Sequence, residues 1–403
     1  MKYAILINPV SSFSYYYERL SANFKVLAVF SPQLCLPLNI IEKFADVHLI
    51  LSGNIKHDAH LIGTLTSGFG IAFSLNCNES DLLYGEKLIN TLSSSFFSQN
   101  EEKYLSMREN KFSMQLALKE FGLHHIEQQV IYSNCNRDHL SKHCFPLVVK
   151  PISDSYCSSG VFICNSEAEL LKAIDYNFSN NTILNKKCES ILIEKFIRGD
   201  EYIVDGFVYD GRLSISGVFL YKKTIIHNHP VYNHINTINK SNSEWKILSE
   251  FAENAVKALH INTGLVHFEL MMNEDGVWMV ELNSRLSGCA GAINKLAQYV
   301  YGLDQLSLIE NAIGFPLSCK PSFRFGRIYC VQNHKAEESD FVPIRDICSK
   351  VDVIFNKNNN SHELSSSLSR SLLDTSAYVI LADDETDNLE KACAQLDKYF
   401  YSS

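Results

Sequence analysis

Several motifs that would assign a function directly are missing from this chain of 403 residues. It has no GxxxxGK(S/T) phosphate loop, no GxGxxG dinucleotide-binding motif and no GxSxG nucleophile motif. Its twelve cysteines form no CxxC pair, which argues against a zinc ribbon and against a small secreted disulfide framework. P-loop, Rossmann and serine-hydrolase readings therefore have no support, and we expect the thiols to be reduced.

Long apolar runs and a basic charge balance are missing as well. No 18 consecutive residues are apolar, and the apolar run in the N-terminal MKYAILINPV is too short for a signal peptide. The formal net charge is -9, so the chain lacks the positive field that nucleic acids and anionic membranes require. We expect a cytoplasmic protein with no nucleic-acid or membrane partner. A hydrophobic content of 46% over this length predicts two or three domains.

The segment HFELMMNEDGVWMVELNSRLSG, residues 267–288, places carboxylates inside an apolar frame. Glu269 lies in one strand-like run, and Glu281 lies in the next. Asn283 and Arg285 follow Glu281 at alternating positions, which puts these three side chains on one face of a strand. Two carboxylates and an amide suit Mg²⁺, and a neighbouring arginine can grip a phosphate. A hairpin whose polar face meets water would show the same pattern.

The two glutamates can share a metal only if they point to the same face of the hairpin. A loop of two or four residues would put Glu269 and Glu281 on opposite faces, whereas a three-residue loop over 274–276 makes them direct partners. Such loops usually end in a left-handed residue that forms a G1 bulge. We therefore predict this loop, with a positive φ at Gly276.

Residues 145–164, FPLVVKPISDSYCSSGVFIC, read as a short strand that ends in Lys150 and enters a loop of small polar residues closing on Gly160. Small residues let backbone N–H groups approach a phosphate, and the lysine supplies a positive charge. An exposed hairpin with a solvated lysine would read similarly.

Residues 191–213, ILIEKFIRGDEYIVDGFVYDGRL, read as a strand, a glycine turn and a second strand, with Glu194 and Glu201 flanking the bend. A strand edge of this kind can offer backbone groups to an adenine ring. A nearby carboxylate can accept hydrogen bonds from ribose hydroxyls.

Taken in order, these segments resemble an ATP-grasp carboxylate-amine ligase over roughly residues 100–315. Residues 201–223 are more similar to the L-amino-acid ligases that make dipeptides than to D-alanine ligases or biotin carboxylases. The resemblance implies catalytic roles for Arg285 and Lys150. It implies Mg²⁺ ligands at Glu269, Glu281 and Asn283. It also implies nucleotide contacts at Lys111, Lys150, Ser155, Ser158, Ser159, Gly160, Glu194, Lys195, Phe196, Ile197 and Glu201.

Two lysines compete for the role of the first nucleotide lysine, Lys103 and Lys111. Lys111 is favoured because Met114 and Leu118 continue from it at helical spacing and Gly122 closes the helix.

The expected fold class is α/β, with α+β character in the C-terminal part, arranged as an ATP-grasp fold. The expected domains are a parallel-sheet α/β domain over 1–100, a central region over 101–200 with a small lid subdomain at about 130–200, a catalytic antiparallel-sheet domain over 201–315 and a β-rich subdomain over 316–403. Ser166 and Glu169 form a capping-box pattern that starts a helix in the lid. Residues 357–371 read as a surface loop.

Three histidines, His227, His229 and His234, lie in a segment that we interpret as a mobile substrate loop rather than a metal site. His267 shares the face of Glu269 and is either a core-edge histidine or a partner that supports a metal ligand. Lys222 and Lys223 are candidates for binding a substrate carboxylate.

The resemblance implies a reaction in which ATP phosphorylates the carboxylate of an amino acid and an amine, expected to be a second amino acid, attacks the acyl phosphate. ADP and phosphate are then released. The expected cofactors are ATP and two Mg²⁺ ions, with Mn²⁺ as a substitute. The expected partners are amino acids or small peptides, and a homodimer is included among the expected assemblies. A kinase-like or carboxylase-like ATP-grasp enzyme and a catalytically silent nucleotide-binding regulator are the alternatives.

Overall fold

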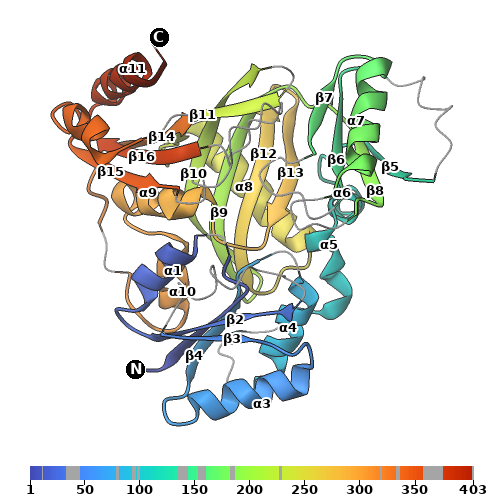
Figure 1. Cartoon of the computed structure of the whole chain (residues 1–403), viewed down its shortest axis with the longest axis vertical. Helices are drawn as coiled ribbons and strands as arrows, with labels where there is room; N and C mark the ends of the chain where they lie inside the picture. Colours follow the sequence, from blue (N-terminus) through green and yellow to red (C-terminus); the bar gives the residue numbers. More distant parts are fainter. Residues whose placement is uncertain are drawn as a thin grey trace.

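Three β-sheets organise the part of the chain that the computed structural model describes (Figure 1). The described residues are 1–10, 12–32, 46–78, 81–92, 97, 100–134, 144–152, 160–181, 187–226, 229–317, 320–332, 336–356 and 375–401. Within them, no helix combines the length and the apolar character needed to cross a lipid bilayer.

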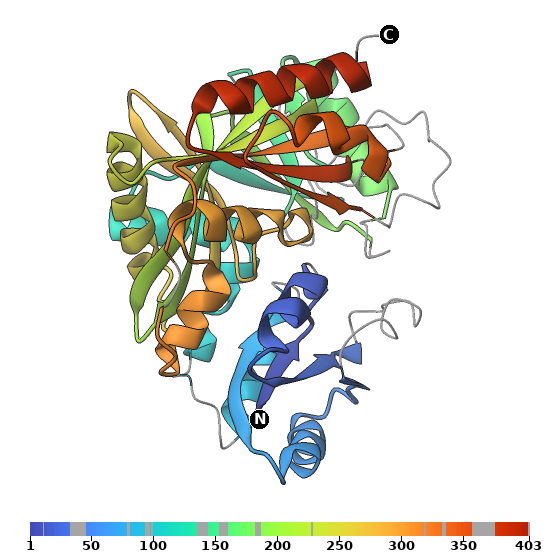
Figure 2. The ribbon, with the colours of Figure 1, turned by 90° about the vertical axis from the view of Figure 1, so that its left-hand side faces the viewer.

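The first sheet is parallel and has the strand order β3-β2-β1-β4. Its strands are almost continuously apolar, which is typical of a parallel sheet covered by helices on both faces. This confirms the predicted N-terminal parallel sheet, which lies below the other two sheets in Figure 2. Its elements are β1 (Tyr3–Ile7), α1 (Phe13–Leu20), β2 (Lys25–Phe30), β3 (Val47–Ile50), α3 (Ile55–Thr66), β4 (Ile71–Asn76) and α4 (Leu82–Thr91).

A short helical connection follows, formed by η2 (Glu102–Tyr104), α5 (Ser106–Glu109) and α6 (Lys111–Phe121). The Asn110 side chain caps α6 by accepting a hydrogen bond from the Ser113 N–H at 3.0 Å. Gly122 ends the helix with φ of 85°. The predicted start at Lys111 and the predicted glycine closure are both confirmed.

The second sheet is antiparallel, with the order β5-β8-β6-β7 and α7 (Glu167–Ser179) packed against it. Its strands are β5 (Gln128–Tyr132), β6 (Leu147–Pro151), β7 (Phe162–Cys164) and β8 (Ser190–Lys195). Ser166 caps α7 as predicted, through a 3.3 Å bond from the Glu169 N–H. The return bond differs from a capping box, because the Glu169 carboxylate accepts from the Asn165 N–H at 2.8 Å instead of from Ser166.

The third sheet is antiparallel and has the order β13-β12-β9-β10-β11-β14-β16-β15. Its strands are β9 (Asp200–Tyr209), β10 (Arg212–Ile226), β11 (His229–Thr237), β12 (Gly264–Asn273), β13 (Gly276–Asn283), β14 (Phe325–Gln332), β15 (Lys350–Phe355) and β16 (Thr375–Asp383). The helices around it are α8 (Ser243–Ala258), η4 (Cys289–Gly291), α9 (Ala292–Tyr301), α10 (Gln305–Ala312), η5 (Glu338–Ile344) and α11 (Thr386–Tyr401).

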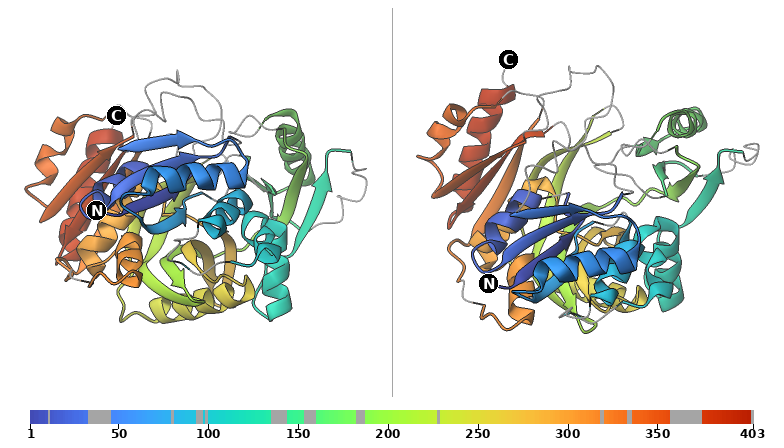
Figure 3. Two further views of the ribbon diagram at one scale, coloured as in Figure 1. Left: turned by 90° about the horizontal axis from the view of Figure 1, so that it is seen from below. Right: turned by 60° about the horizontal axis from the view of Figure 1, so that its bottom comes forward.

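The C-terminal strands extend this sheet, because β14 pairs with β11. Figure 2 shows α11 lying across the C-terminal strands, and Figure 3 shows the parallel sheet from below. The proposed domain limits stay predictions, and the loop expected at 357–371 lies outside the described residues.

The segment interpreted as a mobile substrate loop is a hairpin in its described part. Lys222 pairs with His234, and Ile226 pairs with His229, so β10 and β11 run almost to the turn. The interpretation of this segment as a loop is therefore wrong for residues 229–234. Isoleucine, valine and threonine in this stretch favour paired strands over an open loop. His227 lies outside the described residues.

The hairpin of β12 and β13 places its two glutamates opposite each other as predicted, but through a β-bulge instead of a three-residue loop. Glu269 pairs with Glu281, and Gly276 has φ of 146°, which confirms both expectations. The three-residue loop is wrong, because Asn273 pairs with Gly276 and only two residues remain in the turn. The register shifts next to Glu269, which leaves Val280 as the extra residue of a bulge. The bulge, and not the length of the turn, puts the two carboxylates on the same face of the hairpin.

We expect Gly276→Ala to lower the free energy of unfolding by about 1–3 kcal/mol, because an alanine is strained at this φ. Its Cβ would also come within 2.4 Å of the His124 ring. Tryptophan fluorescence during chemical denaturation reports on this hairpin, since Trp278 of β13 stacks on His124.

The matched control is Gly63→Ala, which adds a Cβ to open space inside α3. This control should raise the free energy of unfolding by roughly 0.5–1 kcal/mol. Equal stability of the two variants would contradict the proposed strain at Gly276.

Candidate functional site

Four buried or nearly buried glutamates form what we call the acidic wall: Glu194, Glu201, Glu269 and Glu281. Each comes from a different strand, β8, β9, β12 and β13, and each faces a basic side chain. In each of these four acid-base pairs, both side chains are less than 20% exposed. Most of this set was predicted from sequence. Strand pairing explains why Glu201, Glu269 and Glu281 converge, whereas Glu194 belongs to the smaller sheet.

Strand register places the central members of the wall. Glu269 of β12 lies opposite Ile203 of β9, and Glu201 lies two residues before Ile203, so both glutamates share one face. On the other side of β12, Glu269 is the direct partner of Glu281. The Asn283 amide donates to Glu281 Oε1 at 3.0 Å, which confirms that these two side chains lie on one face.

Lys111 pairs with the Glu281 carboxylate at 3.0 Å, from the first turn of α6. Burial alone would raise the pKa of Glu281, but the ammonium groups of Lys111 and Lys150 lower it to about 2. The competing candidate, Lys103, is largely exposed and pairs with Glu101 at 2.9 Å. Of the two lysines, only Lys111 lies at the wall, although its role toward a nucleotide stays a prediction.

Lys150 joins the small sheet to the large one. Its Nζ lies 2.8 Å from Glu194 Oε2, and this pair is almost completely buried. The same Nζ lies 3.5 Å from the carbonyl oxygen of Val280, the residue at the β13 bulge. The bulge therefore does two things, because it restores the parity of the glutamates and turns a carbonyl toward Lys150.

Lys223 was grouped with Lys222 in the sequence, but the structure separates the two lysines. Lys222 forms an exposed pair with Asp200, whereas Lys223 Nζ lies 2.5 Å from Glu201 and 4.2 Å from the centre of the Tyr232 ring. Burial would lower the pKa of Lys223, but the Glu201 carboxylate raises it above its ordinary value. Lys223 is therefore a permanent positive charge at the wall.

His267 supports Glu269 from inside the sheet. Its Nδ1 lies 2.7 Å from Asp205 Oδ1, and its Nε2 lies 3.5 Å from Glu269 Oε1. Burial opposes a charge on the imidazole, but Asp205 and Glu269 raise the pKa of His267 to about 9. Asp205 was not predicted as a site residue, although an aspartate inside the apolar strand EYIVDGFVY was a usable signal.

Glu269, Glu281 and Asn283 offer oxygen atoms, which are the ligands that Mg²⁺ prefers. Among the described residues, no group of three His, Cys, Asp or Glu side chains is arranged to hold a metal by itself. Three protein oxygens are half of an octahedral shell, so this donor set fits Mg²⁺ when phosphate oxygens and water supply the rest.

Of the remaining predicted residues, five lie in the described part of the chain and three lie outside it. Arg285 follows the end of β13, and its Nη1 donates to the Leu286 carbonyl at 3.1 Å. Lys195 is exposed at the end of β8, and Phe196 and Ile197 follow it. The Phe196 N–H donates to the Pro146 carbonyl at 3.4 Å. Gly160 has φ of 74°. Ser155, Ser158 and Ser159 lie outside the described residues.

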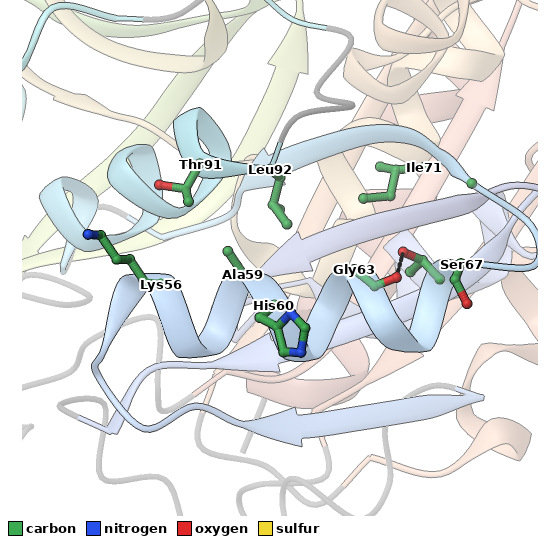
Figure 4. A pocket seen from close by; sticks show the side chains of 10 residues that line it. Lys56, Ala59, His60, Gly63, Ser67, Ile71, Thr91 and Leu92 are labelled. Carbon is green, nitrogen blue, oxygen red and sulfur yellow. Dashed lines mark hydrogen bonds between the residues drawn. The ribbon is translucent and has the colours of Figure 1, made fainter.

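A separate cavity of about 510 Å³ lies between α3, the end of α4 and the start of β4 (Figure 4). It is lined by Lys56, Ala59, His60, Gly63, Thr66, Ser67, Gly70, Ile71, Thr91 and Leu92. No predicted site residue is among them, so this cavity belongs to the N-terminal sheet and not to the wall.

Comparison with known proteins finds a family match in the central region. A family model described as an ATP-grasp domain matches residues 143–293. Among curated proteins, dapdiamide A synthase of Enterobacter agglomerans is 27% identical over 274 residues, which are 68% of this chain and 62% of that protein. The chain thus covers less than two thirds of the length of this relative.

Solved structures match nearly the whole chain. The L-amino acid ligase from Bacillus licheniformis has a TM-score of 0.74 and 15% identity, covering 99% of this chain and 98% of that chain. The biotin carboxylase domain of the Hydrogenobacter thermophilus 2-oxoglutarate carboxylase, solved with MgADP and bicarbonate, has a TM-score of 0.63 and 13% identity, covering 96% and 89%. At such identities the likeness concerns the fold alone.

We expect Glu281→Gln to lower the free energy of unfolding at pH 7 by about 1–3 kcal/mol, because the charged partner of Lys111 is lost. The folded-state pKa of Glu281 is depressed from 4.5 to about 2. Its stabilising contribution is therefore complete above pH 4.5 and is lost as the pH falls toward 2. The deficit of the variant should shrink between about pH 5 and about pH 2, as measured by chemical denaturation.

Glu274→Gln is the control, since Glu274 is exposed at the hairpin turn. This variant should match the wild type at every pH. A Glu281→Gln deficit that grows on acidification would contradict the assigned direction of the pKa shift.

Proposed function

We propose that this chain, which carries an ATP-grasp domain in residues 143–293 and has the ATP-grasp fold, is an ATP-dependent carboxylate-amine ligase. It would join the carboxylate of one amino acid to the amine of a second and release ADP and phosphate. The names of two similar proteins, dapdiamide A synthase and L-amino acid ligase, support this substrate class. A homodimer and a cytoplasmic location are further parts of the proposal.

The observation that carries the proposal is the acidic wall with its paired basic side chains. Phosphoryl transfer needs positioned charge more than covalent help from the protein. Lys111, Lys150 and Lys223 provide three ammonium groups within a mostly buried site. Facing them, the carboxylates and the Asn283 amide provide oxygen ligands. A surface that only binds a nucleotide has no need of both sets.

Lys111 and Lys150 would hold phosphate oxygens of ATP in the proposed complex. Each now pairs with a glutamate, at 3.0 Å and 2.8 Å respectively. An incoming phosphate would compete with Glu281 for Lys111, so Glu281 becomes free to act as a metal ligand. Binding of ATP and of metal should therefore assist each other.

Glu269, Glu281 and Asn283 would hold Mg²⁺, which when bound neutralises charge on the transferred phosphoryl group. We propose two ions, with Mn²⁺ able to replace Mg²⁺. The adenine would lie at the end of β8, at residues 194–197, as the resemblance implies; β8 itself is an interior strand, paired with β5 and β6, and so offers no free strand edge.

The reaction would proceed in two steps. A carboxylate oxygen of the first amino acid bonds to the γ-phosphorus of ATP while the bond to the β-phosphate oxygen breaks, which releases ADP. The amine nitrogen of the second amino acid then bonds to the carbonyl carbon, phosphate leaves, and the nitrogen loses a proton. Arg285 would stabilise the negative oxygens of the acyl phosphate and of the tetrahedral intermediate.

The direct test incubates the protein with ATP, Mg²⁺ and pools of amino acids, and follows phosphate release and product mass. ADP and phosphate together with a dipeptide mass support the proposal. AMP and pyrophosphate would overturn it, and an absence of turnover with every pool would favour a silent nucleotide-binding regulator.

We expect Arg285→Ala to lower kcat by roughly 10²–10³-fold with nearly unchanged ATP affinity, because the contact strengthens as charge develops in the transition state. Steady-state kinetics and calorimetry separate the two quantities. Arg212→Ala is the control, because Arg212 is exposed at the start of β10. A loss of ATP affinity with unchanged kcat would assign Arg285 to ground-state binding.

We expect Lys150→Met to weaken ADP binding by about 1.5–3 kcal/mol, the value of one charge-assisted contact. Calorimetry measures this change, and exposed Lys257→Met in α8 is the control. The variant also leaves Glu194 buried without its cation, so Lys150→Met combined with Glu194→Gln is needed to separate folding damage from binding. Wild-type affinity in the double variant would remove Lys150 from the site.

A further inference from the structure

One buried carboxylate contacts a neighbour of the proposed metal ligand Glu269 and a neighbour of Arg285. Asp205 lies in the middle of β9 and is 1% exposed. Its Oδ1 faces His267 Nδ1 at 2.7 Å, and its Oδ2 accepts a short hydrogen bond from the Ser287 hydroxyl. His267 in turn faces Glu269, and Ser287 lies two residues after Arg285. Asp205 therefore connects the proposed metal carboxylate to the loop that carries the proposed phosphoryl-binding arginine.

The first arm of this network, from Asp205 through His267 to Glu269, follows from cross-strand pairing. Asp205 and His267 are direct partners on β9 and β12, which brings their side chains together on one face. An imidazole between two carboxylates satisfies both by donating from each nitrogen. Glu269 Oε1 is 3.5 Å from His267 Nε2, so the ring limits where this carboxylate can turn.

The second arm, from Asp205 to Ser287 next to Arg285, is held by several hydrogen bonds. The Ser287 N–H donates to Gln305 Oε1 at 3.0 Å, and the Ser287 carbonyl accepts from the Ser12 hydroxyl at 2.8 Å. Gln305, which is fully buried, donates to the Val266 carbonyl at 2.9 Å. Ser287 thus has its N–H, carbonyl and hydroxyl all bonded to groups of other elements.

An ionised carboxylate in this position is costly unless it is paired and hydrogen-bonded, and an apolar residue would often be at least as stable. Asp205 has partners for both oxygens, and each partner leads to a different part of the site. Stabilisation of the fold alone does not require that the two oxygens of Asp205 bond to two different parts of the site.

We propose that Asp205 and His267 are positioning residues that fix the place of Glu269 relative to the loop of residues 284–288, which we call the arginine loop. The metal-binding carboxylate and Arg285 can then act on the same phosphoryl group. The inference rests on the proposed function, because it assigns Glu269 to the metal.

The test measures Mn²⁺ affinity by electron paramagnetic resonance in protein saturated with ADP, and ADP affinity by calorimetry in EDTA. His267→Ala and Asp205→Asn should weaken Mn²⁺ binding by about 10- to 100-fold, the range found when the partner of a metal ligand is removed. ADP affinity in EDTA should stay close to that of the wild type, because the change acts on the support of a metal ligand. Glu269→Gln provides the reference for loss of the ligand itself.

Two further variants separate positioning from folding damage. His267→Gln can present an amide donor near the Nε2 position and should recover part of the Mn²⁺ affinity lost in His267→Ala. Asp58→Asn changes another fully buried aspartate, bonded to Ser52 and Tyr84 in the N-terminal part, and should leave Mn²⁺ affinity unchanged even if it lowers the melting temperature.

Ser287→Ala tests the other arm. It should lower kcat of the ligase with little change in KM and little change in Mn²⁺ affinity, because only the arginine loop is released. Unchanged kcat would overturn the coupling of this loop to Asp205.

The outcomes distinguish this inference from the proposed function. Wild-type protein that binds neither ADP nor Mn²⁺ would overturn the proposed function together with the inference. Metal binding in the wild type with unchanged Mn²⁺ affinity in His267→Ala would overturn the inference alone. An equal loss of Mn²⁺ and metal-free ADP affinity would also overturn it, since that pattern indicates general damage. Equal Mn²⁺ affinities in His267→Gln and His267→Ala would show that the Nε2 of His267 does not support the Glu269 carboxylate.

Discussion

The desolvation of charge is the constraint on which the site depends. Removing a single ion from water costs several kcal/mol in a real protein, and a partner of opposite charge must offset that cost. Along the acidic wall each glutamate has such a partner: Lys111, Lys150, Lys223 or His267. The basic groups therefore stand in place before any ligand arrives. Ligand binding on this surface is an exchange of ionic partners, which costs less reorganisation than bringing charges in from solvent.

Sequence patterns predicted the architecture well where local rules decide it. The alternation of strands and helices over residues 1–100 indicated the parallel sheet, and the helical spacing from Lys111 together with Gly122 indicated the limits of α6. The faces of Glu281 and Asn283 followed from the period of two along a strand. Such features depend on residues close together in the chain, so a single sequence contains the information.

Features set by distant contacts were not accessible in this way. The bulge at Val280 was missed because a turn and a bulge can restore the same parity, and only the neighbouring strands determine which of the two occurs. Lys223 and Lys222 were indistinguishable because the pairing of Tyr221 with Glu201 on β9 decides which of the two lysines shares the face of Glu201. Asp205 went unnoticed because its partners, His267 and Ser287, lie 62 and 82 residues away. The roles of the predicted site residues toward ATP, metal and amino acids stay predictions.

The bond between Ser12 and the Ser287 carbonyl has a consequence for how the chain folds. These residues are 275 positions apart, and α1 packs against the short helix that follows the arginine loop. A ribosome would release the N-terminal parallel sheet long before it synthesised the loop. Long-range contacts of this kind form late, because the entropy of closing the chain must be overcome first. The surface of α1 must therefore stay available until residue 287 has been made, because Tyr15 and Tyr16 of α1 share one buried apolar cluster with Leu286 and Leu306.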